Sequence, residues 1–203
     1  MTEISQYKEL LLRICQEWDK SEEYIKEAEQ VNNAVVFPSI KELRYAGRRI
    51  VEALYLIASD GERSKIEDLL RDANFDCHRA RHDAIDAATS KIAVDLDIAV
   101  KYLGPDAVIE SFPKFSSLIE RLQIIRKKIV QSRGNREQRE EIYASIEGQD
   151  FPDLISLYFE FKSSEEIMKR AARRSRARQT VANVVALAAV VLAIFFAVIA
   201  MRS

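Results

Sequence analysis

Residues 62–103 read ERSKIEDLLRDANFDCHRARHDAIDAATSKIAVDLDIAVKYL and carry the strongest helical pattern of the chain. Apolar side chains recur in it every three or four residues, which places them on one face of an α-helix. The residues on that face are Ile66, Leu70, Ala73, Cys77, Ala80, Ala84 and Ala88. Gly104-Pro105 follows directly and is typical of a helix end. The stretch therefore predicts one long helix, whose alanines allow a neighbouring helix to pack closely.

The segments on both sides of this stretch also have helical periodicity. Residues 2–34 carry a nearly regular seven-residue repeat, and residues 39–58 place apolar side chains at core spacing. Ser39 and Glu42 have the spacing of a capping box, which predicts that the second helix begins there. The seven-residue repeat is typical of a coiled coil and fits either packing within the chain or contact with a second copy. Further helices are expected over residues 113–132, 135–148 and from 151 onward.

The composition agrees with a helical protein. The 203 residues include five Gly and four Pro, too few for the frequent turns of a β-sandwich or barrel. An apolar content of 48% excludes a disordered chain, and two Cys exclude a disulfide scaffold. The sequence thus predicts an all-α fold, with a cytoplasmic bundle of long antiparallel helices in residues 1–168 and one C-terminal transmembrane helix.

The charges are divided unevenly along the chain. From Lys169 to Ser203 there are seven basic residues and no acidic residue, so the first 168 residues hold 24 basic and 32 acidic side chains. Affinity for nucleic-acid backbones comes mainly from clustered Lys and Arg. We therefore expect no general nucleic-acid binding by the acidic part of the chain.

Residues 181–201, VANVVALAAVVLAIFFAVIAM, contain no charged side chain. As a helix they rise about 31 Å, which matches a hydrocarbon core about 30 Å thick, so they predict the transmembrane helix. Residues 169–180 then form a basic segment at the membrane surface, whereas Arg202 alone follows the apolar residues. The basic residues before the apolar segment are Lys169, Arg170, Arg173, Arg174, Arg176 and Arg178. By the positive-inside rule, this asymmetry predicts a single-pass protein of the inner (plasma) membrane with a cytoplasmic N-terminal domain.

Small residues recur on one stripe of the apolar segment. They are Ala182, Ala186, Ala189, Ala193, Ala197 and Ala200. Such a stripe lets helix backbones approach closely, which favours a homo-oligomer, although a chance pattern in an alanine-rich segment is the alternative.

Five residues of the predicted helices are candidates for a ligand site. Two readings remain open for the basic ones among them: Arg–Asp pairs with Asp72 and Asp76 that hold the helices together, or a pocket for an anion or nucleotide. The five candidates are Arg44, Arg48, Tyr55, His78 and His82. His78 and His82 are four residues apart and could share a metal, but no further His is present, so we expect no metal and no cofactor.

Arg71-Asp72 and His78 resemble the loose Arg, polar residue, His pattern of the HEPN class of helical ribonucleases. That resemblance implies a ribonuclease in which His78 and Arg71 act on RNA. The sequence contains no phosphate-binding loop, nucleophile elbow or paired-carboxylate motif, and we expect a protein that is not an enzyme.

The layout of the chain, with the segments Glu42-Leu-Arg-Tyr-Ala-Gly-Arg-Arg49 and His78-Arg-Ala-Arg-His-Asp83, resembles small membrane effectors of bacterial anti-phage defence systems. That resemblance implies an effector whose cytoplasmic domain senses a nucleotide, an oligonucleotide or a protein partner. Its transmembrane helices would then assemble into a pore or depolarise the membrane. The alternatives are a membrane scaffold that does not conduct ions and the tethered ribonuclease.

Overall fold

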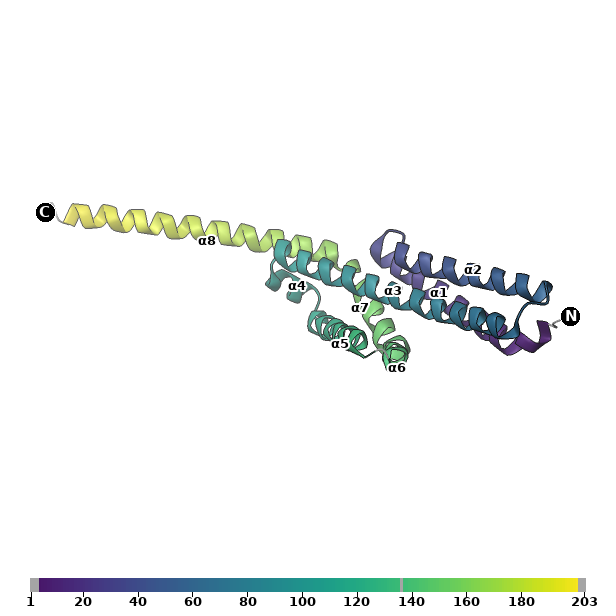
Figure 1. The fold of residues 1–203 in the computed structure, drawn as a ribbon. Coiled ribbons are helices and arrows are strands. Elements are labelled where there is room, and N and C mark those ends of the chain that lie inside the picture. The colour runs from purple at the N-terminus through teal and green to yellow at the C-terminus, as the bar shows by residue number, and fades with distance from the viewer. Residues whose placement is uncertain (1–3, 136, 201–203) are drawn as a thin grey trace. The chain divides into compact units, whose positions relative to one another are not determined.

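The computed structural model describes the backbone of residues 4–135 and 137–200 and the side chains up to residue 190, and all its regular elements are helical (Figure 1). The all-α prediction is therefore confirmed for the described part of the chain. In chain order the elements are η1 (Ile4–Tyr7), α1 (Lys8–Asn32), α2 (Phe37–Ala58), α3 (Arg63–Leu103), α4 (Pro105–Ser111), α5 (Phe115–Gly134), α6 (Arg139–Ser145), η2 (Ile146–Asp150), α7 (Phe151–Ser163) and α8 (Glu165–Ala200).

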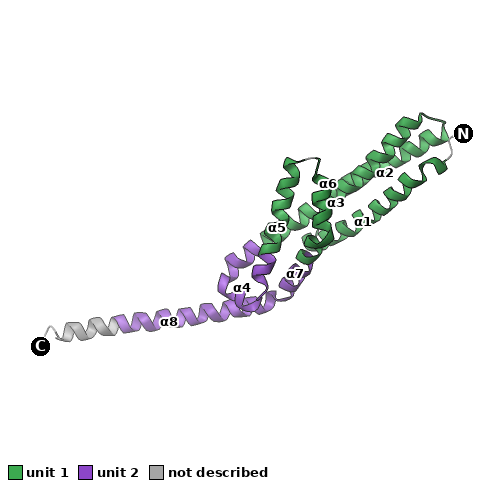
Figure 2. Cartoon of the chain, turned by 90° about the horizontal axis from the view of Figure 1, so that it is seen from below, with its two compact units in different colours: residues 1–95, 120–154 green, residues 96–119, 155–203 purple. Residues whose placement is uncertain are grey.

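The chain divides into two compact units, drawn in green and purple in Figure 2. Unit 1 comprises residues 1–95 and 120–154, and unit 2 comprises residues 96–119 and 155–203. Helices α3, α5 and α7 each contribute residues to both units. The domain limits predicted after residues 168 and 180 both fall inside α8.

The core of unit 1 lies between α1, α2 and α3. Its buried members are Tyr7 and Ile14, Ala46 and Ala53 of α2, and Ile66, Leu70, Ala73 and Cys77 of α3. All seven residues predicted on the core face of α3 are fully buried, which confirms that prediction. Alanines on both α2 and α3 let the two backbones approach closely. Beside the core residue Ala46, a Cβ on Gly47 would lie 3.6 Å from the Trp18 ring, so the glycine leaves room for the indole.

The seven-residue repeat of α1 packs within unit 1. Ser21 interrupts the apolar repeat but is fully buried, and its hydroxyl donates a hydrogen bond to the Cys77 carbonyl oxygen at 2.8 Å. The buried members of the repeat are Tyr7, Ile14, Ile25 and Ala28. Packing within the chain therefore accounts for these positions, and contact with a second copy stays a prediction.

The predicted capping box at the start of α2 is wrong. Helix α2 begins at Phe37 with Pro38 in its first turn, where a missing N–H costs no helical hydrogen bond. Ser39 is consequently the third residue of the helix and not its cap, and Ser39 and Glu42 are 0% and 5% exposed. Instead of capping α2, the Glu42 carboxylate accepts a hydrogen bond from Arg79 of α3 at 3.1 Å.

Several boundaries after α3 also differ from the prediction. The short helix α4 was not expected, and α6 passes through a π-helical turn, η2, directly into α7, so Gly148 ends no helix. The expected continuous helix from residue 151 onward is broken at Ser164, whose N–H donates to the carbonyl oxygens of Glu160 and Phe161 at 3.2 and 3.0 Å. In unit 2, α4 packs against α8, and the Phe161 ring meets Phe112 edge-on at a centroid distance of 5.7 Å.

The predicted transmembrane helix must be corrected. Within the residues that the structure describes, no helix has both the length and the apolar character that crossing a membrane requires. The eighteen residues of α8 that end at Val190 include four arginines, and the apolar residues 181–190 rise only about 15 Å. Ala182, Ala186 and Ala189 of the alanine stripe are exposed. The side chains of Ala193, Ala197 and Ala200, like residue 201, lie outside the described part of the chain.

Candidate functional site: the polar segment of α3 and its groove

The middle of α3 concentrates the polar side chains of unit 1. From Asp72 to Asp86 this helix carries four carboxylates, two arginines and both histidines. Asp76, Arg81 and His82 are buried among them, at 1%, 5% and 8% exposure. Buried ionic groups need partners, and α1, α2 and α6 supply them.

Arg81 is the centre of a buried ion-pair junction. Its guanidinium binds the carboxylate of Glu17 on α1, and its Nε donates to Oε1 of Glu147 at 2.9 Å. Burial by itself would raise the pKa of Glu17, but the hydrogen bond and the charge of Arg81 lower it below the usual value. Burial by itself would lower the pKa of Arg81, but the carboxylates of Glu147 and Glu17 raise it above its usual value. The junction therefore holds α1 and the α6–η2 segment on α3 through charges that depend on one another.

His78 lies beside this junction. Its Nε2 is 3.3 Å from the Glu17 carboxylate and 3.3 Å from Nδ2 of Asn74, and its Nδ1 is 3.4 Å from the Glu140 carboxylate. The side chain is 18% exposed. His78 thus links α1 and α6 to α3, and both of its ring nitrogens have polar neighbours, which come from α1, α3 and α6.

His82 stacks on Tyr143 of α6, with ring centroids 3.6 Å apart and ring planes 15° apart. Burial, followed by the charge of Arg81, lowers the pKa of His82 to about 3. The Tyr143 hydroxyl donates a hydrogen bond to Asp86 at 2.7 Å, and burial together with Asp86 raises the pKa of Tyr143. Arg133 of α5 pairs with the same carboxylate at 3.0 Å. A neutral histidine and a neutral tyrosine therefore form one wall between α3, α5 and α6.

Two cavities open beside this wall, and we call them together the α3–α6 groove. The cavities have volumes of about 290 and 630 Å³, the second within the usual range of small-molecule sites. Both are lined by Arg79, His82 and Arg139. Arg79 is paired with Glu42. Arg139 donates from Nε to the Ser132 carbonyl oxygen at 3.4 Å, and no carboxylate of the described residues lies within ion-pair distance of it.

The structure does not bring the predicted ligand residues together. Arg44, Arg48 and Tyr55 are exposed on α2, and no contact in the described part of the chain joins them to His78 or His82. The adjacent Arg49 forms the expected ion pairs instead. Its guanidinium binds the buried carboxylate of Asp76 and lies 3.6 Å from the carboxylate of Asp72. The predicted pairs with Asp72 and Asp76 therefore form, but with Arg49 as the arginine, because one residue beyond Arg48 is a rotation of about 100° around α2.

Sequence reasoning found His82 but missed Arg79, Arg139 and Tyr143. The last two lie on a short helix more than fifty residues after His82 along the chain, so no local pattern could connect them. Arg71, the other residue of the ribonuclease pattern, is exposed and pairs with Glu67 and Asp68. Among the described residues, no three His, Cys, Asp or Glu side chains are grouped in a way that could hold a metal.

Comparison of the chain with protein-family models, with curated proteins and with solved structures gave no match.

Proposed function

We propose that this chain is a ligand-responsive helical effector, and that unit 1 senses a small anion in the α3–α6 groove. The observation that carries the proposal is the position of Arg139. This side chain lines both cavities of the groove and has no carboxylate within ion-pair distance among the described residues. A partly buried guanidinium that forms no ion pair favours an external anion, and its planar donors fit phosphate and carboxylate oxygens.

The remaining lining favours a small ligand over a polymer. Arg79 adds a second guanidinium, whereas Asp83, Glu137 and Glu140 place negative charge around the same cavities. A long polyanion would meet those carboxylates, as it would meet the acidic surface of the first 168 residues. A ligand with one or two anionic groups can contact the two guanidinium groups alone. A mononucleotide is the nucleotide regulator that fits this arrangement best.

The groove also offers a means of response. His82 and Tyr143 connect the cavity wall to Asp86, and His78 and Arg81 connect the same turn of α3 to α1 and η2. A ligand that binds Arg139 of α6 would favour one position of α6 relative to α3. The contacts of His78 and Arg81 with Glu17 would change as well, and this change would move α1, the helix that carries Glu17. The layout of the chain resembles effectors of anti-phage defence. In such a protein, this change would convert an infection signal into effector activity.

The proposal is tested by measuring binding of AMP and pyrophosphate to the full chain by calorimetry. We expect Arg139→Gln to weaken binding roughly tenfold, because it removes a charge-assisted contact. Arg44→Gln is the matched control, since Arg44 is an exposed arginine of the same unit outside the groove. Loss of binding in Arg44→Gln with normal binding in Arg139→Gln would place the site on α2 and contradict the groove. The proposal would also be contradicted if the full chain bound neither AMP nor pyrophosphate.

A second candidate function, contact of α8 with an anionic lipid surface, is favoured by the basic segment 169–180. Arg170, Arg173, Arg174 and Arg178 are exposed, and none has an ion pair within the described part of the chain. Basic residues near an anionic lipid surface each contribute about 1 kcal/mol. A scaffold that docks on lipid headgroups needs only this segment.

The lipid function is tested by sedimentation with vesicles of phosphatidylglycerol and of phosphatidylcholine. We expect binding to the anionic vesicles that salt weakens, and loss of this binding when the four arginines are replaced by Gln. Replacing four exposed lysines and arginines of α2 and α3 instead should preserve it. Equal binding of the α8 variant and the parent to anionic vesicles would exclude a role for these arginines.

A further inference from the structure

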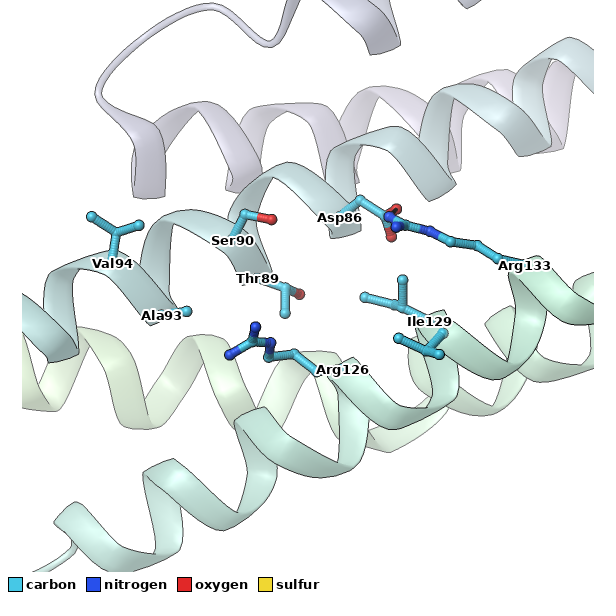
Figure 3. Close-up of a pocket in the computed structure, with 9 residues that line it drawn as sticks. Asp86, Thr89, Ser90, Ala93, Val94, Arg126, Ile129 and Arg133 are labelled. Atoms are coloured by element: carbon cyan, nitrogen blue, oxygen red, sulfur yellow. Dashed lines mark hydrogen bonds and ion pairs between the residues drawn. The ribbon is translucent and has the colours of Figure 1, made fainter.

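We propose that a third cavity, between α3 and α5 of unit 1, binds a small amphipathic anion: a phosphate or carboxylate group that carries an apolar body. The cavity has a volume of about 360 Å³. Helix α3 contributes Asp86, Thr89, Ser90, Ala93 and Val94, and α5 contributes Arg126, Ile129, Val130 and Arg133. In Figure 3, Thr89 and Ala93 of α3 and Arg126 and Ile129 of α5 face the space between the two helices.

Thr89 supplies the first observation. The residue is 2% exposed, and its hydroxyl has no hydrogen-bond partner in the described structure. Buried hydroxyl groups are normally hydrogen-bonded, because removing them from water without a partner is unfavourable. Since Thr89 lines the cavity, a ligand oxygen placed there would accept the hydrogen bond that the protein leaves unmade.

Arg126 supplies a second, independent observation. Its side chain extends from α5 toward Thr89 and Ala93 of α3 (Figure 3). Neither a carboxylate nor a hydrogen-bond acceptor of the described residues pairs with its guanidinium. A cation and an unsatisfied hydroxyl therefore face the same space from two helices. An oxyanion is the group that satisfies both, because it can accept a hydrogen bond from each.

The other end of the cavity does not repel such an anion. Asp86 is the one carboxylate among the residues that line it, and this carboxylate already accepts hydrogen bonds from Arg133 at 3.0 Å and from Tyr143 at 2.7 Å. Its negative charge is thus balanced by Arg133, which leaves the charge of Arg126 available to a ligand.

The rest of the lining determines the character of the ligand. Ala93, Val94, Ile129 and Val130 present apolar surface around the space, and Val94 and Val130 are 53% and 67% exposed without a ligand. An apolar body of modest size would cover these side chains and release water from them. Inorganic phosphate would leave them uncovered. The site therefore differs from the α3–α6 groove, whose lining is mostly charged, although both include Asp86 and Arg133.

The test uses octyl phosphate as the probe, with inorganic phosphate and the neutral octyl glucoside for comparison, and calorimetry on the full chain. We expect octyl phosphate to bind more tightly than either comparison compound. Thr89→Val keeps the shape of the side chain and removes only the hydroxyl, and Arg126→Gln removes the charge. Each variant should weaken binding of octyl phosphate roughly tenfold. Because Thr89→Val removes an unsatisfied hydroxyl, the variant should fold at least as well as the parent.

Arg44→Gln is the matched control, because Arg44 is an exposed arginine of the same unit that lines neither this cavity nor the α3–α6 groove. It should leave binding of octyl phosphate unchanged. Thr89→Val should leave binding of AMP in the α3–α6 groove unchanged, which lets this inference and the proposed function fail separately. Equal binding by Thr89→Val and the parent would overturn the proposal. So would equal binding of octyl phosphate and octyl glucoside, since the charge of the phosphate would then contribute nothing to binding.

Discussion

Acid should destabilise unit 1 through His82 at pH values where most carboxylates are still ionised. The side chain is 8% exposed and stacked on Tyr143, and burial lowers its pKa from 6.5 to about 3. In the unfolded chain, the same imidazole binds a proton as the pH falls through 6.5. Between pH 6.5 and pH 3 the unfolded state therefore binds more protons than the folded state, and the free energy of unfolding falls as the pH falls. The stabilisation is fully present above pH 6.5.

The size of the effect follows from the two pKa values. One pH unit between them changes the free energy of unfolding by about 1.4 kcal/mol. Lowering the pH from 7.5 to 5.0 therefore costs about 2 kcal/mol. Glu17 has a lowered pKa, so its own contribution is lost only below its usual value of 4.5. Asp83 has a raised pKa, caused mainly by burial, and acts in the opposite direction. A variant at position 82 separates His82 from both.

The assay is urea unfolding at pH 7.5 and pH 5.0, followed by fluorescence of Trp18, the single tryptophan of the chain. Trp18 lies on α1 within unit 1, the unit that contains His82. His82→Phe keeps an aromatic ring against Tyr143 but cannot bind a proton. We expect the parent to lose about 2 kcal/mol more than the variant between the two pH values. An equal loss in both proteins would show that His82 is not held neutral in the folded state.

Three further substitutions test the packing of α3 and the turn after it, each by urea unfolding. Arg81→Met should lower the free energy of unfolding by about 3 kcal/mol, because it removes the buried guanidinium that pairs with the partly buried carboxylates of Glu17 and Glu147. Restoration by Glu17→Gln in the same chain would confirm that cause, and a stable single variant would refute it. Asp76→Asn should destabilise unit 1 more than Asp72→Asn, because the side chain of Asp76 is 2% exposed and that of Asp72 is 61% exposed. Equal effects would mean that the ion pair of Arg49 with Asp76 stabilises the fold no more than its pair with Asp72. Gly104→Ala should cost about 1 kcal/mol, because the backbone there has φ of 87°, and an unchanged midpoint would argue against that conformation.

Local sequence alone predicted the helical class and the core face of α3. Both depend on interactions between residues three or four positions apart, which any segment of that sequence makes by itself. The buried faces from Ile66 to Ala88 and from Tyr7 to Ala28 followed from this periodicity. The same local reasoning failed at Ser39, because a proline in the first turn was a stronger start signal than a capping box. It failed again at Ser164, where the helix breaks without Gly or Pro.

The candidate sites depended on the tertiary structure. Asp76 pairs with Arg49 and not with Arg48 because of the rotation of α2 about its own axis. The pattern of charges in the sequence does not specify this rotation. The stack of His82 on Tyr143 and the approach of Arg126 to Thr89 join residues far apart along the chain. Which residues each helix turns inward could be predicted from local sequence, because that is a property of one helix. Which helices meet, and so which charges find a partner, depends on the packing between helices.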